Sequence, residues 1–171
     1  LPRFQDDRTV EPKAFHEAQK ARGREQKNIK RSPGCGTLNI GLEELRDTAY
    51  CQAGVRLIKE YAAQDAPWFI ECDFDNPHPP CELPQPFDSR YEPSRMALSP
   101  SLHDSLADKP AVMRTARARL DTAAWTDDEW RLLRAHYCGA LTLVDELLGR
   151  MLAALDRSGQ AENTLVVFTS D

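Results

Sequence analysis

The sequence predicts an α/β fold, in which helices flank a mostly parallel sheet, and two features lead to this prediction. Amphipathic helical patterns alternate along the chain with two short apolar runs, at residues 68–72 and 164–169. Both runs are rich in aromatic or β-branched residues and carry apolar residues at successive positions, which is typical of strands buried on both faces. The predicted order is helix, strand, loop, long helix and strand.

The composition is that of a globular chain and excludes several other classes. Of the 171 residues, 41% are apolar and 29% are charged, and no run approaches the roughly 20 apolar residues that a bilayer-crossing helix needs. The net charge of −5 argues against a nucleic-acid-binding protein of the basic kind. Residues 1–40 nevertheless hold nine Lys or Arg against five Asp or Glu. We interpret them as a polar basic leader, a loop or cap with a solvated surface, and contact with an anionic partner is the alternative.

The first half of the chain is divided by breaks in its helical patterns. Residues 13–26 predict one helix, which the Gly and Pro residues at 32–36 end. From Leu42 to Ala62, apolar residues recur at three- and four-residue steps, which is the period of an amphipathic helix. Pro67 stops this helix before the first apolar run. The proline-rich residues 77–100 predict an extended, stiff loop, because each proline ring removes a backbone donor.

The long helix has a complete set of start signals. Thr126 is the predicted cap, and Glu129 completes a capping box. Trp125 and Trp130 occupy the two positions of a hydrophobic staple. Apolar residues then continue at helical spacing for about thirty residues, to a predicted stop at Gly159.

The five cysteines form an odd set, and no two of them have the two-residue spacing that zinc sites and redox motifs use. The proline-rich loop would permit a disulfide between Cys72 and Cys81, but we favour free thiols. The redox compartment therefore stays open.

Two residues stand where chemistry is expected. Asp171 follows the second predicted strand, and the crevice outside the carboxyl ends of strands is the usual place for a site in an open α/β sheet. Its carboxylate suits a hard cation, and a capping role is the alternative. His78 lies just past the first predicted strand, between Pro77 and Pro79. Imidazole exchanges protons near neutral pH, so His78 suits a general acid or a donor to an anionic substrate, with a merely solvated histidine as the alternative.

These segments together resemble the sulfatase family. Residues 66–80, in which a Pro and two aromatics lead into the sequence Pro-His-Pro-Pro, resemble the family's strand and "Pro His x Pro" loop. Residues 163–171 resemble the family's strand that begins with Asn-Thr and ends in Thr-Ser-Asp. Residues 137–140 and 144–150 resemble the helix that precedes this strand. The similarity covers roughly residues 45–171.

The resemblance implies an alkaline-phosphatase-like α/β sandwich that hydrolyses sulfate esters with a formylglycine nucleophile and calcium. It places Asp171 among the metal ligands and implies that His78 contacts the sulfate ester and protonates the leaving oxygen. We assign Asn76, close to His78, as a further substrate contact. The implied partner is a small-molecule or carbohydrate sulfate ester. The compartment stays open, although sulfatases are often exported, periplasmic or lysosomal.

Parts of the family's pattern have no match in this sequence. None of the five cysteines begins the nucleophile motif, which reads Cys or Ser, any residue, Pro or Ala, any residue, Arg. Asp6 and Asp7 form an acidic pair, but no apolar strand precedes them, so we reject them as the family's first metal ligands. We therefore expect residues 41–171 to be a partial catalytic domain, incomplete at both ends, and the chain alone to be inactive.

Two further functions stay open beside sulfate ester hydrolysis. A phosphonate or phosphate ester hydrolase of the same superfamily would look nearly the same, because tetrahedral sulfate and phosphate esters call for similar donors. A non-catalytic relative would bind a sulfate ester without turning it over.

Overall fold

The computed structural model describes residues 17, 34–119 and 122–170. The predicted helix at 13–26 lies outside the described residues apart from Glu17, which is helical, and Asp171 also lies outside them. The elements in chain order are β1 (Cys35–Leu38), η1 (Leu42–Glu44), α2 (Arg46–Ala62), β2 (Cys81–Pro84), η2 (Pro93–Arg95), α3 (Ala111–Arg119), η3 (Thr122–Ala124), α4 (Asp127–Arg157) and η4 (Ala161–Asn163).

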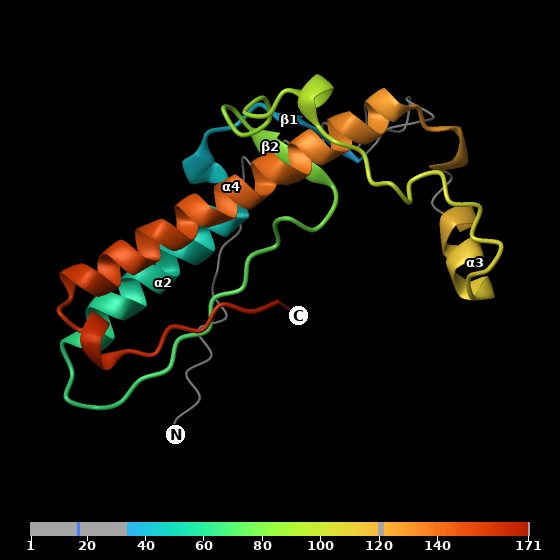
Figure 1. The fold of residues 1–171 in the computed structure, drawn as a ribbon. Helices are drawn as coiled ribbons and strands as arrows, with labels where there is room; N and C mark the ends of the chain where they lie inside the picture. Colours follow the sequence, from blue (N-terminus) through green and yellow to red (C-terminus); the bar gives the residue numbers. More distant parts are fainter. Residues whose placement is uncertain (1–16, 18–33, 120–121, 171) are drawn as a thin grey trace.

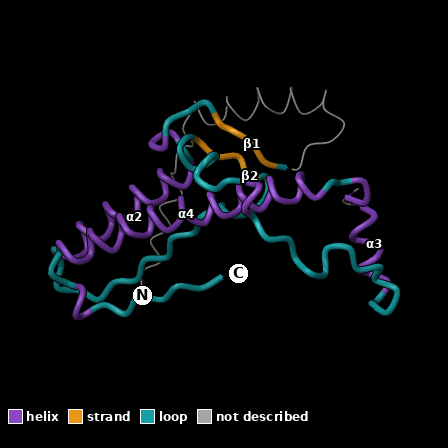
Figure 2. Tube along the Cα trace, turned by 45° about the horizontal axis from the view of Figure 1, so that its top comes forward, coloured by secondary structure: helices purple, strands orange, loops and turns teal. Residues whose placement is uncertain are grey.

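The sheet is a parallel pair of short strands packed beside helices, which confirms the α/β class (Figure 2). Cys35 of β1 lies opposite Cys81 of β2, and Leu38 lies opposite Pro84. The sequence predicted loops at both places, and this was wrong. Prolines are tolerated at the first or last positions of an edge strand, where no ladder donor is needed, and Pro84 closes β2 in this way. β1 lies within the basic leader but belongs to the packed core, since Leu38 is buried.

Helices α2 and α4 lie side by side and run in the same direction (Figure 1). The contacts advance together along both helices. The Cys51 thiol donates to the carbonyl oxygen of Leu147 at 3.2 Å. About two turns further along both helices, Ile58 packs with Leu155. The amino-terminal half of α4 instead packs against β2. One core therefore joins both helices and the sheet; its buried members are Leu38, Leu45, Cys51, Leu83, Phe87, Ala140, Leu143 and Leu147.

The ends of α4 confirm the predicted start and stop signals. Thr126 Oγ1 accepts from the Glu129 backbone N–H at 3.3 Å, and Glu129 Oε2 accepts from the Thr126 N–H at 2.6 Å. The Trp125 and Trp130 rings pack with their centroids 4.6 Å apart. Gly159, just past the helix, has a φ of +74°, a conformation in which glycine meets no Cβ penalty.

The first amphipathic helix begins later than predicted. Residues 42–44 form a 3-10 turn, Leu45 is extended, and the α-helix begins at Arg46. The extended residue lets the Leu45 side chain enter the core, where it is 2% exposed. Thr48 then donates from Oγ1 to the carbonyl oxygen of Leu42 at 2.7 Å and closes the break.

Neither of the two apolar runs forms a strand, which corrects the prediction. Residues 68–74 and 164–170 run as extended chain with no ladder partner among the described residues (Figures 1 and 2). Extended backbone becomes a strand only when a neighbouring strand takes its N–H and C=O groups. The sequence correctly predicted extended backbone at both runs, but no neighbouring strand pairs with either of them in the described part of the chain.

Helix α3 stands away from the core at the far end of α4 (Figure 1), and the sequence analysis assigned no helix there. None of its residues is buried. Arg114 and Arg117 hold it to the preceding loop by donating to carbonyl oxygens of that loop, among them those of Lys109 and Leu102. Among the described helices, none is both long and apolar enough to cross a membrane.

Candidate functional site

The predicted acid, His78, lies on a tight turn that follows the first extended segment. The turn closes where the His78 backbone N–H donates to the carbonyl oxygen of Asp75 at 3.0 Å, and the peptide bond before Pro77 is cis. β2 begins three residues later at Cys81, whose N–H donates to Gly34 at 2.7 Å. The turn is therefore held between the helical layer and the sheet, and it presents an exposed imidazole.

The His78 ring is oriented by its own backbone. Nδ1 lies 2.7 Å from the carbonyl oxygen of Pro79. A carbonyl oxygen only accepts hydrogen bonds, so Nδ1 carries a proton, and Nε2 is the nitrogen that can exchange a proton with a ligand. Nε2 has no hydrogen-bond partner within the described segments.

Asn76 points its amide toward the protein rather than toward His78. Its Nδ2 donates to Asp47 Oδ2 at 2.7 Å, and its backbone N–H donates to the same oxygen at 3.1 Å. This amide nitrogen is therefore occupied in holding the turn. A substrate contact by Asn76 stays a prediction.

Asp47 is the residue that the sequence analysis missed. It sits in the first turn of α2, is 2% exposed, and accepts three hydrogen bonds from the loop, the third from the Asp75 N–H at 2.9 Å. The only signal in the sequence was that Asp47, a carboxylate, stands two residues after the core residue Leu45, near the start of the amphipathic helix. Because Asp47 is 28 residues from Asp75 in the chain, the contact itself was visible only in three dimensions.

A second link ties the same two elements together at the surface. The Arg46 guanidinium donates to the Asp75 carboxylate, with the two side chains 26% and 54% exposed. Exposed ion pairs of this kind contribute little stability by themselves. The buried Asp47 contacts are therefore the stronger restraint on the turn.

The described residues do not supply a metal site. No group of three or more His, Cys, Asp or Glu side chains within residues 34–119 and 122–170 is arranged to hold an ion. The carboxylate nearest His78 along the turn, Asp75, is paired with Arg46. The predicted ligand Asp171 lies outside the described residues, so its role as a metal ligand stays a prediction.

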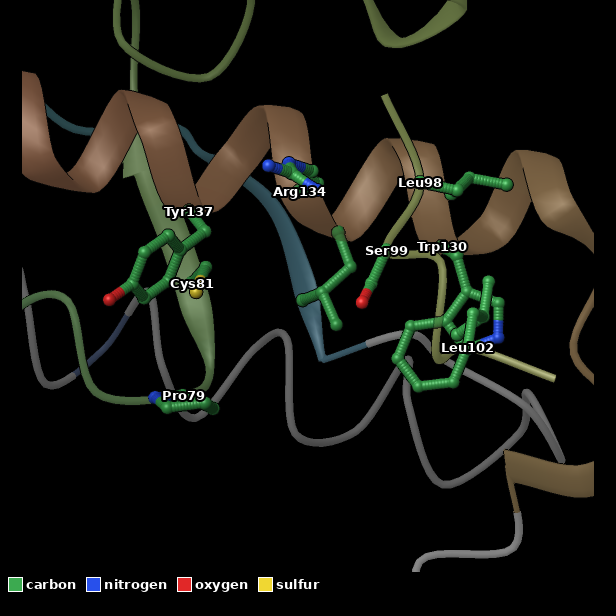
Figure 3. A pocket seen from close by; sticks show the side chains of 9 residues that line it. Pro79, Cys81, Leu98, Ser99, Leu102, Trp130, Arg134 and Tyr137 are labelled. Carbon is green, nitrogen blue, oxygen red and sulfur yellow. The ribbon is translucent and has the colours of Figure 1, made fainter. Parts of the chain in front are cut away.

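An apolar hollow of about 290 Å³ lies beside the His78 turn (Figure 3). Pro79 forms one wall and the face of α4 forms another, with the Tyr137 and Trp130 side chains turned into it. Arg134 lies at its margin. Such a lining suits an apolar group, but His78 itself is not among the lining residues.

The five cysteines are free thiols, and three of them are made less reactive by their surroundings. Burial raises the pKa of Cys72 to about 11, with smaller contributions from the neighbouring Cys51, Asp73 and Asp47. Burial also raises the pKa values of Cys51 and Cys81. A nucleophilic cysteine needs a lowered pKa, so none of these three suits that role.

Comparison with known proteins identifies the class to which this fold and loop belong. The family model described as "Sulfatase" matches residues 3–171. The chain therefore belongs to the sulfatase family. Among curated proteins, it is 31% identical over 118 residues to "Multifunctional alkaline phosphatase superfamily protein PehA" of Trinickia caryophylli, covering 61% of this chain and 23% of that protein.

Two further relatives carry sulfatase names. The chain is 29% identical over 142 residues to iduronate 2-sulfatase of Mus musculus, covering 74% of this chain and 25% of that protein. It is 31% identical over 109 residues to a protein named "Sulfatase" of Formosa agariphila, covering 61% of this chain and 22% of that protein. The chain thus spans about a quarter of the length of these relatives.

Proposed function

We propose that the protein containing this chain hydrolyses sulfate esters and that His78 protonates the leaving oxygen. The observation that carries the proposal is the His78 turn, where an exposed imidazole has Nδ1 committed to Pro79 and Nε2 left for a ligand. Membership of the sulfatase family supports the choice of reaction. The names of the relatives in mouse and Formosa agariphila, both sulfatases, point the same way.

The proton transfer follows from the charge that develops in the reaction. Breaking the sulfur–oxygen bond leaves negative charge on the departing oxygen. An imidazolium at His78 would donate its Nε2 proton to that oxygen, so the alcohol leaves neutral. The Nδ1 contact to Pro79 holds the ring so that Nε2 keeps one direction during the step.

The proposal includes a formylglycine nucleophile and a calcium ion, with Asp171 as one ligand. The formylglycine side chain would supply the attacking oxygen, and a bound calcium ion would supply a positive charge beside the sulfate oxygens. Calcium takes about six to eight oxygen ligands, and the described residues do not bring such a set together. The 171-residue chain on its own is therefore proposed to be inactive.

The test is the dependence of the His78→Ala effect on the leaving group, measured in the full-length protein. Against an alkyl sulfate, whose alkoxide is a poor leaving group, we expect kcat/KM to fall by about 100- to 10,000-fold. Against a nitrophenyl sulfate, whose phenolate departs without a proton, we expect a much smaller fall. An equal loss on both substrates would point to binding, and no loss on either would remove His78 from the reaction.

His103→Ala is the matched control for this test. His103 is also an exposed histidine on a loop, but its Nε2 lies 3.1 Å from Asp127 Oδ1 on α4. We expect turnover of both esters to be unchanged in this variant.

A phosphate or phosphonate ester hydrolase is the second candidate. The observation that favours it is the 31% identity to PehA, which is named a multifunctional alkaline phosphatase superfamily protein. Matched nitrophenyl sulfate and nitrophenyl phosphate separate the two candidates, since a strong preference for phosphate would replace the first proposal. Binding of a sulfated ligand without turnover would instead identify a non-catalytic relative.

A further inference from the structure

We infer that Asp47 is a positioning residue, which holds the Asp75–His78 turn in the conformation that directs the His78 ring. This inference rests on the proposed function of His78. It concerns a residue 31 positions earlier in the chain, on a different element.

The first step of the argument is the burial of the Asp47 carboxylate. The residue is 2% exposed, and an isolated buried carboxylate is costly unless hydrogen bonds replace its water. Both oxygens are used, with Oδ1 accepting from the Asp75 N–H at 2.9 Å and Oδ2 accepting from the Asn76 N–H and Nδ2 at 3.1 and 2.7 Å. Because Asp47 lies in the first turn of α2, the positive end of the helix dipole also stabilises its negative charge.

The second step is what these bonds do to the loop. Two successive backbone N–H groups directed at one carboxylate fix the orientation of two successive peptide planes, at Asp75 and Asn76. The next hydrogen bond along the chain, from His78 N–H to the Asp75 carbonyl at 3.0 Å, starts from that fixed residue. The His78 Nδ1 contact to Pro79 then completes the path to the ring.

The third step is that other restraints on the turn are weaker. The Arg46–Asp75 ion pair also restrains Asp75, but the Asp75 side chain is 54% exposed, so water competes with Arg46 for its carboxylate. His78, Pro79 and Pro80 are all exposed, so burial restrains these three residues little, and the sheet fixes the chain only from Cys81 onward. The position of the imidazole therefore depends on Asp47 more than on burial of the loop.

The experiment is a double-mutant cycle in the full-length protein, using Asp47→Asn, His78→Ala and the combination. The amide keeps the size of the side chain but brings a donor to face N–H groups. We expect Asp47→Asn to lower kcat/KM for an alkyl sulfate by about 10- to 100-fold, mainly in kcat, because a small misplacement of a reacting group is enough to cost this much. In the His78→Ala background the same substitution should have almost no further effect. Additive losses would overturn the inference.

Thr48→Val is the matched control. Thr48 is fully buried on the same turn of α2, and its Oγ1 donates to Leu42 rather than to the loop. We expect it to lower the melting temperature without a selective fall in kcat. An Asp47→Asn effect on kcat no larger than that of Thr48→Val at matched stability would show that Asp47 serves the fold alone.

Hydrogen exchange provides a readout that does not depend on turnover. The Asp75 and Asn76 amides should exchange faster in Asp47→Asn, while amides within α4 should not change. Two results together separate the claims. If His78→Ala leaves turnover intact while the Asp75 and Asn76 amides still exchange faster in Asp47→Asn, the proposed role of His78 fails but the link from Asp47 to the turn stands. Unchanged exchange would overturn the link itself. Asp47→Ser, which shortens the side chain but brings no amide donor to face the loop N–H groups, replaces Asp47→Asn should the latter not fold. Failure of both to fold would reject positioning in favour of a structural role.

Discussion

The two extended segments, residues 68–74 and 164–170, are both rich in aromatic or β-branched residues but have different surroundings. In the first, side chains alternate, so that Trp68 and Ile70 pack on the ends of α2 and α4 while Phe69 is 80% exposed. In the second, four consecutive apolar residues face outward, and Leu165 is 88% exposed. The difference teaches that two packed helices are enough to position one face of an extended segment. In the described part of the chain, no such pair of helices packs against residues 165–168, and their side chains are exposed.

The comparison also separates the two predicted site residues. The first segment leads into the His78 turn, which Asp47 ties to α2 by three hydrogen bonds. The second leads toward Asp171, which lies outside the described residues. The half of the candidate site that depends on α2 is therefore formed in this chain, and the half that depends on the second segment rests on the resemblance alone.

The largest expected effect lies in the core on which the first segment rests. Leu143→Ala should lower the free energy of unfolding by about 2–5 kcal/mol, because Leu143 is fully buried and the substitution leaves a cavity. Leu165→Ala in the second segment should change it by no more than about 0.5 kcal/mol. Urea unfolding of the same chain measures both. Equal effects would mean that the second segment is packed as well.

The next effect concerns the contact between α4 and the residues after β2. A Cβ on Gly139 would meet the Phe87 carbonyl oxygen, with the Leu83 side chain also close, so Gly139→Ala should lower the free energy of unfolding by about 1–3 kcal/mol. Gly149, in the same helix, has open space at its Cβ position, and Gly149→Ala should raise stability by roughly 0.5–1 kcal/mol. Thermal unfolding gives the sign of each, and two changes of the same sign would contradict the packing of α4 on this side.

A direct comparison of the two segments gives a smaller difference. Trp68 is half-buried in the cluster formed with Ile58 and Leu155, so Trp68→Ala should cost about 2 kcal/mol, less than the full burial of an aromatic ring provides. Phe168 is 77% exposed, and Phe168→Ala should be nearly neutral. If chemical denaturation shows Phe168→Ala to be the more costly of the two, the contrast between the segments fails.

The last effect is a pH dependence at Cys72, in the first segment, and it is absent at neutral pH. The folded chain keeps this proton up to its raised pKa of about 11, whereas the unfolded chain releases it near the ordinary pKa of 9.0. The stability that this site provides is therefore complete below pH 9 and is lost as the pH rises toward 11.

Alkylation measures this shift directly. At pH 8, iodoacetamide should modify Cys72 about 100-fold more slowly in the folded chain than in urea, because two pKa units change the thiolate fraction by that factor. Peptide mass spectrometry separates Cys72 from the other four thiols. Similar rates in the two states would show that the first segment is not packed at this position.

Much of the helical structure was predictable because its causes are local. The capping box of Thr126 and Glu129, the tryptophan staple and the stop at Gly159 lie within a few residues of the helix ends that they define. The later start of α2 was not predictable, since the extended Leu45 is explained only by the core that its side chain enters. The strands β1 and β2 were missed because their short sequences carry proline and glycine and gain their pairing from each other.

The sequence by itself determined the α/β class, the long helix and the position of the His78 loop, because periodicity, capping and proline placement act over short distances along the chain. Tertiary structure alone decided which extended segments have neighbours and what holds the loop. Asp47 and Asn76 are 29 residues apart. A single aspartate in a helix gives no sign of which distant N–H groups will donate hydrogen bonds to it. A buried carboxylate is stabilised only by donors brought to it in space, so this part of the site became visible only when the chain was folded.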